Sequence, residues 1–186
     1  IDSSSRRNLE LTENLKEKSK KGSLIWVLDK TSTTMGGRAL RKWIEEPLIN
    51  IDEINNRLNS VDELFNNIYF TEELREALRD IYDIERIVGK ISNKNVNAKD
   101  LVSLNISLKK LPEIKERLSV CKADLLNKWY KNLDVLEDIS TLLSKALLDD
   151  PATSIKEGNI IKAGYSDKVD ELREAKLNGK QWIASL

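Results

Sequence analysis

The sequence contains no histidine and only one cysteine, and both shortages exclude whole classes of chemistry. Without histidine, the chain cannot form a Ser-His-Asp or Cys-His catalytic group, or a histidine-ligated metal site, from its own residues. The single cysteine, Cys121, excludes an internal disulfide and is typical of a protein from a reducing compartment. No apolar run approaches the roughly 20 residues that a membrane-spanning helix needs.

The glycine-rich patterns that cradle phosphates are also missing. Neither the nucleotide-binding pattern G-x-x-x-x-G-K-[ST] nor the dinucleotide-binding pattern G-x-G-x-x-G occurs in the chain. Acidic pairs such as Glu45/Glu46 and Glu72/Glu73 are plentiful, but adjacent residues point to different faces of a helix. We therefore interpret them as solvated surface groups, and we predict no catalytic, cofactor-binding or metal-binding residue in this chain.

Positive and negative charges balance, with 31 of each, so the chain as a whole has no strong attraction for nucleic acid or for a membrane surface. Locally, residues 92–131 carry 9 basic and 4 acidic side chains. Lysines neutralise phosphates and aromatic rings stack on bases, so this segment is the best candidate for DNA contact. The lysines do not share one clear helical face, and a solvated surface is the other interpretation. The candidate DNA contacts are Lys109, Lys110, Lys128 and Trp129.

Most of the chain has apolar side chains at the three- and four-residue spacing that is typical of amphipathic helices. We expect Pro112 to end or kink one of these helices and to begin another short one. Short apolar seams of this kind indicate an all-α helical bundle. The predicted helices include residues 50–68, 71–91, 97–111 and 133–150, and the seam of the first comprises Ile51, Ile54, Leu58, Val61, Phe65 and Ile68.

Two segments depart from the helical pattern. Residues 23–31 are an apolar run too short to assign by periodicity. Residues 154–164 contain Glu157-Gly158-Asn159 between isoleucines, which predicts a small β-hairpin. The last segment, residues 166–186, has a helical pattern that stops without a capping residue, and the chain begins at Ile1 rather than at a methionine. We therefore expect the chain to be a piece of a longer protein.

The stretch Thr31–Leu48, TSTTMGGRALRKWIEEPL, has two interpretations. Its threonines, glycines and arginines could form an anion-binding turn that opens a helix. Alternatively, Thr33 or Thr34 caps an ordinary packed helix. In that packed helix, the inward-facing residues would be Gly36, Leu40, Trp43 and Ile44.

The order of charges in this helix is unusual, because the basic residues come first and the acidic residues last. Arg38 and Arg41 lie in its first half and Glu45 in its last turn, which opposes the helix dipole. This order of charges lowers the stability of the helix by only tenths of a kcal/mol up to about 1 kcal/mol. The unfavourable order nevertheless predicts that Arg38 binds a carboxylate or carbonyl group elsewhere in the fold.

Residues 28–64 read LDKTSTTMGGRALRKWIEEPLINIDEINNRLNSVDEL. They are similar to a pattern LD-x-T-x-T-x-MG-x-R-x-L-R-x-W that is followed by a proline and an I-x-x-R-x-x-V/I helix. That pattern belongs to the core (lever) domain of the MutS family of DNA mismatch-recognition ATPases, which the whole chain resembles in order. Further similar segments are RRNLEL, DIERIVGKI, KDLVSLNISLKKLPEI and IKEGNIIKAGYSDKVDELR.

The resemblance implies a non-catalytic domain whose long helices act as levers between an ATPase domain and a DNA-binding clamp. Residues 1–165 would form the first segment of this all-α core domain, and residues 166–186 would begin the lever helix toward the clamp. The residues that match the structural signature are Asp29, Gly36, Arg38, Trp43, Pro47, Arg57, Asp83 and Arg86.

The resemblance also implies partners that lie outside this chain. ATP and Mg²⁺ would bind to the ATPase domain of the longer protein, and no cofactor would bind to the segment itself. The expected partners are the connector, clamp and ATPase domains of the same polypeptide. The longer protein would also bind mismatched DNA and MutL. It would be a homodimer in the bacterial cytoplasm, associated with the nucleoid. The alternative hypothesis is an independent helical nucleic-acid-binding module.

Overall fold

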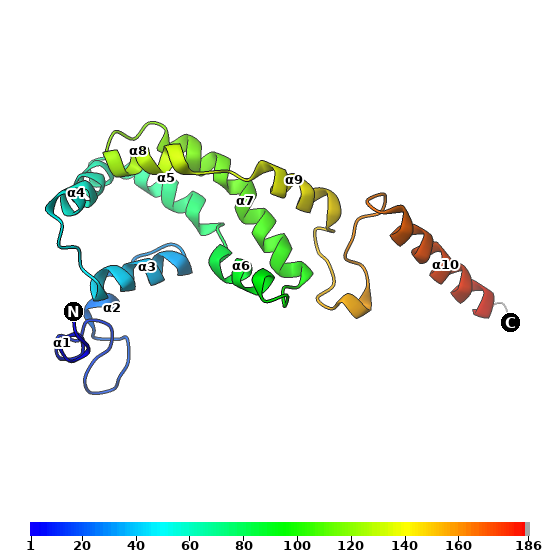
Figure 1. Cartoon of the computed structure of the whole chain (residues 1–186), viewed down its shortest axis with the longest axis horizontal. Helices are drawn as coiled ribbons and strands as arrows, with labels where there is room; N and C mark the ends of the chain where they lie inside the picture. The colour runs from blue at the N-terminus through cyan, green and yellow to red at the C-terminus, as the bar shows by residue number, and fades with distance from the viewer. Residues whose placement is uncertain (185–186) are drawn as a thin grey trace.

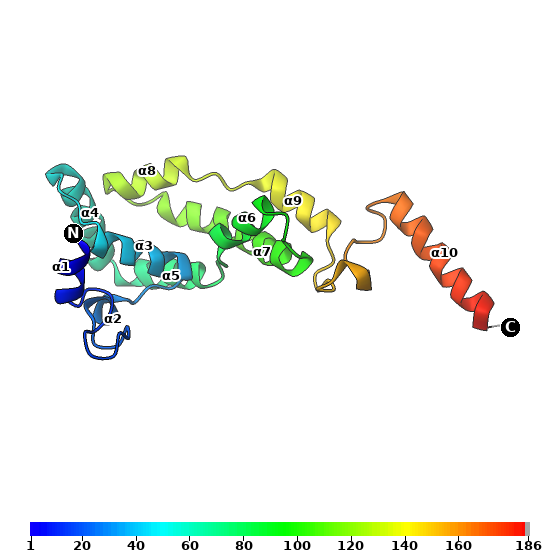
Figure 2. The same ribbon diagram turned by 60° about the horizontal axis from the view of Figure 1, so that its bottom comes forward.

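The structure, a computed structural model, describes the backbone of residues 1–184 and the side chains of residues 1–179. These residues form an elongated row of α-helices, with the two ends of the chain at opposite ends of the row (Figures 1 and 2). The prediction of an all-α fold is confirmed. Within the described residues, no helix is both long enough and apolar enough to cross a membrane. The helices are α1 (Ser3–Asn8), α2 (Leu24–Leu28), α3 (Thr34–Glu45), α4 (Ile51–Phe65), α5 (Ile68–Arg79), α6 (Ile84–Ser92), α7 (Ala98–Leu118), α8 (Asp124–Asn132), α9 (Glu137–Ala146), the short 3₁₀ helix η1 (Ile155–Glu157) and α10 (Asp167–Ala184).

Helix α7 is the centre of the bundle, and α5, α6, α8 and α9 all pack against it (Figure 1). Its N-terminus is fixed by a capping box, in which Asn97 Oδ1 accepts from the Asp100 backbone N–H and Asp100 Oδ2 accepts from the Asn97 N–H. At one end of α7, Leu104 and Leu108 pack with Ile87 of α6. At the other end, α7 meets helices α5 and α8 in a second core cluster. That cluster comprises Ala77, Ile114, Leu118, Cys121 and Leu126.

Helix α7 continues through Pro112, so the predicted end of the helix at this residue, and the separate helix after it, are wrong. The alternative that we predicted, a kink at Pro112, stays a prediction. The proline has no backbone N–H to donate to the Leu108 carbonyl, which costs a helix interior about 3 kcal/mol. Leu108 is only 2% exposed and Ile114 only 6%, so apolar side chains are buried on both sides of the proline. Their burial offsets the lost hydrogen bond, because a fully buried leucine or isoleucine contributes about 1.5–3 kcal/mol.

The predicted helix over residues 71–91 is divided into α5 and α6. A turn at residues 80–83 separates the two, and the buried hydroxyl of Ser107 on α7 accepts from the Tyr82 backbone N–H at 2.9 Å. The same hydroxyl donates to the Ser103 carbonyl at 2.9 Å. The corner between α5 and α6 is therefore anchored to α7 by a buried serine.

The β-hairpin predicted at residues 154–164 does not form. Residues 155–157 are the 3₁₀ helix η1, and Gly158 and Asn159 form the turn after it at positive φ. The chain that follows pairs instead with the end of α9, through an isolated antiparallel bridge between Leu147 and Ile161. The turn residues were correctly recognised, but their partner strand is absent because the preceding residues are helical.

Helix α4 is capped by Asn50, whose Oδ1 atom accepts from the backbone N–H groups of Asp52 and Glu53 at 2.9 and 3.1 Å. Its predicted apolar seam, however, does not lie in the core. The residue of α4 that is buried is Ser60, whereas Leu58 is 58% exposed and Phe65 is 77% exposed. The interpretation of this stripe as a seam of the bundle is therefore wrong for the structure of this chain.

Helix α10 projects away from the other helices at the end of the row (Figure 1). Polar contacts hold its first turns: Asp170 Oδ2 accepts from the Gly164 N–H at 2.6 Å, and Arg173 Nη2 donates to the Ile161 carbonyl at 2.5 Å. The domain boundary that we predicted between residues 165 and 166 stays a prediction.

Replacing Leu126 by alanine tests the core around α7 and α8. Leu126 is 2% exposed and packs with Ile114 and Leu118, so Leu126→Ala should lower the free energy of unfolding by about 2–5 kcal/mol. Urea unfolding followed by circular dichroism measures this loss. The matched control is Leu142→Ala on α9, a leucine that is 53% exposed and should cost less than about 1 kcal/mol. Equal losses for the two variants would contradict the assignment of the core.

Candidate functional site

The segment that leads into α3 is organised by Asp29, which follows the last residue of α2. Its Oδ1 atom accepts from the Thr31 backbone N–H at 3.2 Å and from the Thr31 hydroxyl at 2.7 Å. Its Oδ2 atom accepts from Lys20. These hydrogen bonds, the one from Lys20 first, lower the pKa of Asp29 to about 2. Asp29 therefore stays ionised and fixes the turn from which α3 begins.

Thr33 is the N-cap of α3, as predicted, and its hydroxyl accepts from the Gly36 backbone N–H at 2.9 Å. A side chain at this position would crowd the cap. A Cβ atom at position 36 would lie 3.1 Å from Thr33 Oγ1 and 3.3 Å from Thr31 Cβ, both on relatively rigid side chains. The glycine thus allows the capping turn to close tightly on the first turn of the helix.

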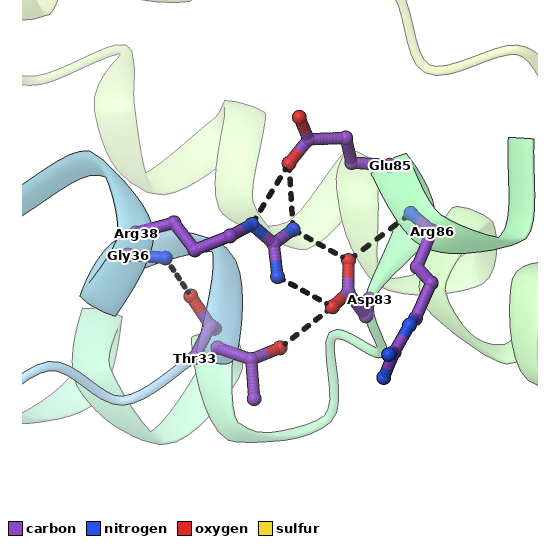
Figure 3. Close-up of polar contacts among 7 residues, drawn as sticks. Thr33, Gly36, Arg38, Asp83, Glu85 and Arg86 are labelled. Atoms are coloured by element: carbon purple, nitrogen blue, oxygen red, sulfur yellow. Dashed lines mark hydrogen bonds and ion pairs between the residues drawn. The ribbon is translucent and has the colours of Figure 1, made fainter. Parts of the chain in front are cut away.

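Arg38 connects α3 to the start of α6, about 45 residues further along the chain (Figure 3). Its Nη1 and Nη2 atoms each donate to one oxygen of Asp83 at 2.7 Å, and Nη2 and Nε donate to Glu85 at 2.6 and 3.2 Å. Two carboxylates thus share one guanidinium, in the bidentate geometry that makes such pairs specific. The prediction that Arg38 finds an acceptor elsewhere in the fold is confirmed.

Asp83 accepts two further hydrogen bonds in this arrangement. It is the N-cap of α6, where its Oδ1 atom accepts from the Arg86 backbone N–H at 3.1 Å, and Thr34 donates to its Oδ2 atom at 3.2 Å (Figure 3). The Arg38 guanidinium, followed by the Arg86 N–H and the Thr34 hydroxyl, holds the pKa of Asp83 well below its usual range. Asp83 is therefore both the cap of α6 and an ion-pair partner of Arg38. We call the cluster of Arg38, Asp83 and Glu85 the Arg38 centre.

The anion-binding interpretation of this segment finds no support in the geometry. A polar hollow of about 770 Å³ lies beside α3, and three of the four cationic side chains that line it, all but Lys18, have carboxylate partners. Lys20 pairs with Asp29, Arg38 with Asp83, and Arg41 Nε with Glu45 at 2.9 Å. Within the described residues, no group of three or more cysteine, aspartate and glutamate side chains could hold a metal ion. The packing interpretation of the segment is the one that the contacts favour.

Trp43 does not face inward as predicted, since its side chain is 41% exposed. It lies under Arg57 of α4, whose guanidinium carbon is 3.8 Å from the ring centroid, a cation–π geometry. Helices α3 and α4 are therefore connected by a stacked arginine and tryptophan rather than by a buried tryptophan. Pro47 is exposed in the connection between the two helices, and the side chain of Arg86 is exposed on α6.

The four candidate DNA contacts lie on two helices, α7 and α8. Lys109 lies beside a hollow between α7 and α9, whereas Lys110 is paired with Asp80 at 3.0 Å. Lys128 is exposed on α8. Trp129 lines an apolar groove of about 620 Å³ between α3, α5, α7 and α8. Lys128 and Trp129 are neighbours on α8, and Lys109 and Lys110 are neighbours on α7, so contact of all four with one nucleic-acid backbone stays a prediction.

One contact that organises the fold had no signal in the sequence. Glu63 on α4 accepts from the backbone N–H groups of Lys122 and Ala123, at 2.7 and 2.6 Å, and so supplies the N-terminal cap of α8 from another helix. A capping residue is normally sought next to the helix that it caps. Glu63 lies about 60 residues away, so no local pattern could have identified it.

The described residues thus define an all-α domain whose helices are joined by long-range ion pairs and caps. The family model described as MutS domain III matches residues 4–183. The chain belongs to the MutS domain III family.

Curated relatives agree with this membership. Over its whole length of 186 residues, the chain is 64% identical to the "DNA mismatch repair protein MutS" of Clostridium beijerinckii. It is also 64% identical to proteins of the same name from two strains of Clostridium botulinum. The chain spans 20% of the length of each of these relatives.

The pH dependence of stability tests the Arg38 centre. Because folding lowers the pKa of Asp83, the ion pair stabilises the folded state at pH values above the ordinary aspartate pKa of about 3.9. That stability is lost as the pH falls from there toward the folded-state pKa. Arg38→Gln should therefore have a lower urea midpoint than the unsubstituted chain at pH 7, and the difference should shrink below about pH 4.

The matched control is Arg41→Gln, which removes an arginine from the same helix whose partner, Glu45, is also on that helix. Pairs of this kind contribute about 0.3–0.5 kcal/mol. The midpoint of this variant should differ little from that of the unsubstituted chain at any pH. An Arg38→Gln difference that stays constant down to pH 2 would contradict the importance of the Asp83 carboxylate.

A salt titration of DNA binding tests the candidate contacts. Since the chain as a whole carries no net charge, we expect the 186-residue chain to bind duplex DNA weakly and without preference for a mismatch. Binding should disappear near physiological salt. Fluorescence anisotropy with matched and mismatched duplexes measures this. Tight, mismatch-selective binding that Lys109→Ala or Lys128→Ala weakens would favour the alternative of an independent nucleic-acid-binding module.

Proposed function

We propose that this chain is a core and lever element of a longer mismatch-recognition ATPase, and that it couples the ATPase domain to the DNA-binding clamp. Its own residues perform no chemistry in this proposal. The helices transmit changes in position between two sites that lie elsewhere in the polypeptide. Such transmission requires packed helices that can adopt two discrete arrangements.

The observation that carries the proposal is the elongated row of helices in a chain that belongs to the MutS domain III family (Figure 1). Its two ends lie far apart, and between them α5, α6, α8 and α9 all pack against α7. A stiff helix of 21 residues, such as α7, spans about 30 Å. A displacement of one of these helices can therefore reach the others through α7.

The proposal extends to partners and cofactors in the longer protein. We propose that connector, clamp and ATPase domains of the same polypeptide pack around this segment, and that ATP and Mg²⁺ bind to the ATPase domain. Mismatched DNA and MutL would be partners of the whole homodimer, in the bacterial cytoplasm at the nucleoid. The relatives' name, DNA mismatch repair protein MutS, supports the mismatch-repair context.

Coupling is measured in the full-length polypeptide that carries this segment. We expect Arg38→Gln, which loosens the contact between α3 and α6, to reduce the fold-stimulation of ATP hydrolysis by a mismatched duplex. Hydrolysis without DNA should stay unchanged, because Arg38 lies in neither site. Coupling between two binding sites is reciprocal, so ATP should also release the variant from mismatched DNA less effectively.

Arg41→Gln is the matched control and should leave both effects at the unsubstituted level, because its ion pair lies within one helix. Stimulation and release that are unchanged in Arg38→Gln would count against transmission through this junction. A variant that also loses its basal hydrolysis would indicate a folding defect, which the urea measurements on the 186-residue chain detect separately.

A further inference from the structure

Helix α8 (Asp124–Asn132) has no capping side chain of its own. Its N-cap residue is Ala123, whose methyl group cannot accept a hydrogen bond from the first turn. The helix has only nine residues, and isolated helices shorter than about 12–15 residues are marginal in water because nucleation is unfavourable. The stability of α8 therefore depends on contacts with other elements of the fold.

The first of these contacts is made at the N-terminal end of α8. Both carboxylate oxygens of Glu63 on α4 take part: Oε1 accepts from the Lys122 N–H at 2.7 Å, and Oε2 accepts from the Ala123 N–H at 2.6 Å. Glu63 is half-buried, so its charge is screened less than at an open surface. A negative charge thus lies at the positive end of the α8 dipole.

The second contact is made at the C-terminal end of α8. Lys115 Nζ on α7 donates to the carbonyl of Leu133, the C-cap residue of α8, at 2.7 Å. This carbonyl is one of those that have no partner within the helix itself. Lys115 is also half-buried, and its positive charge lies at the negative end of the dipole. Charged side chains from two other helices therefore cap α8 at its two ends.

Between these ends, the apolar contact of α8 with the bundle is narrow. The buried residue of α8 is Leu126, which packs in the same core cluster as Ile114 and Leu118 of α7. Trp129, the largest side chain of the helix, is 47% exposed, and Tyr130 is only partly buried. Because apolar stabilisation grows with the area removed from water, this narrow contact makes the two capping contacts decisive for α8.

Glu63 also connects α8 to α3 through α4. The same helix carries Arg57, whose guanidinium carbon lies 3.8 Å from the ring centroid of Trp43 on α3. Helix α4 packs against α8 at one end of the row (Figure 1). Both Glu63 hydrogen bonds are lost when this carboxylate moves away by about 1 Å, because a separation of about 3.6 Å is no longer a hydrogen bond. A small displacement of α4 therefore removes the cap of α8.

We propose that α8 is a conditional helix, which is folded only while Glu63 of α4 and Lys115 of α7 hold its two ends. Withdrawal of either side chain unfolds α8 as one cooperative unit, whereas α7 stays folded. Order and disorder of one segment are two discrete states, and local unfolding of this kind occurs within otherwise native proteins. A movement of α3 and α4 is thereby converted into the presence or absence of a helix that packs on α7.

This proposal rests on the proposed function, because it names α8 as the element with two discrete states that transmission requires. Its test, hydrogen exchange of backbone amides, uses neither ATP nor DNA. A negative exchange result leaves the coupling experiments with Arg38→Gln unaffected. If those coupling experiments fail, exchange still decides whether the folding of α8 is conditional.

Hydrogen exchange in the full-length polypeptide tests the proposal. Within α8, the Asn127 N–H donates to the Ala123 carbonyl at 2.9 Å and the Leu133 N–H to the Trp129 carbonyl at 2.8 Å, so the amides of residues 127–133 report on the helix. Mass spectrometry of overlapping peptides separates the two ends of α8. We expect Glu63→Gln to accelerate exchange of these amides at least tenfold, because the variant loses the charge and one of the two acceptor oxygens.

Lys115→Met is the second variant, and it removes the donor at the opposite end of α8 while keeping the aliphatic stem of the side chain. In a cooperative unit, both variants accelerate the same amides, including those near the end that is not altered. Amides of α7 around Leu104 and Leu108 should keep their exchange rates.

The matched controls are Glu53→Gln on α4 and Lys109→Met on α7. Both residues are exposed, and within the described part of the chain their side chains make no hydrogen bond or ion pair with α8. Neither control should change exchange in α8.

Three results would overturn the proposal. Acceleration confined to the end that each variant touches would show independent fraying of two ends rather than one unit. Acceleration of α7 to the same degree would show that the whole domain is destabilised. Unchanged rates in both variants would show that the apolar contact of Leu126 is sufficient to keep α8 folded.

Discussion

The uninterrupted passage of α7 through Pro112 determines where four other helices of this chain can lie. Helices α5, α6, α8 and α9 pack against α7, and its buried leucines and isoleucines belong to both core clusters. A helix that ended at Pro112 would separate these clusters. The cost of one proline is about 3 kcal/mol, which is comparable to the contribution of one or two buried apolar side chains, and α7 buries more than that.

Polar groups join the first part of the chain to the bundle that α7 organises. Arg38 binds Asp83 and Glu85, Thr34 binds Asp83, and Arg57 stacks on Trp43. Exposed ion pairs contribute little to stability, but a bidentate arginine between two carboxylates fixes an orientation that apolar contacts leave open. The orientation of α3 relative to the rest of the chain is therefore determined more by directed polar contacts than by buried apolar area.

Among the described residues, two of the surfaces that stay apolar after folding lie next to α4 and α8. One is the exposed apolar stripe of α4, which includes Leu58, Val61 and Phe65, and the other is the groove of about 620 Å³ that Trp129 lines. Both are consistent with a domain that matches one fifth of its relatives' length and that folds among further segments. A covering surface outside these 186 residues also explains why the apolar period of α4 predicts a buried seam that the structure does not contain. Periodicity identifies the side chains that avoid water, but it does not say whether the covering surface belongs to the same 186 residues.

By itself, the sequence determined the all-α class, a cap for α3 at Thr33 or Thr34, the need of Arg38 for an acceptor, and membership of the MutS domain III family. These features depend on local spacing and local charge, which a sequence displays directly. The tertiary structure alone decided the rest: helix α7 continues through Pro112, Glu63 caps α8, residues 154–164 form no hairpin, and the apolar stripe of α4 lies outside. Each of those outcomes is a balance between a local preference and burial against residues distant in the chain, and only the folded arrangement shows which side prevails.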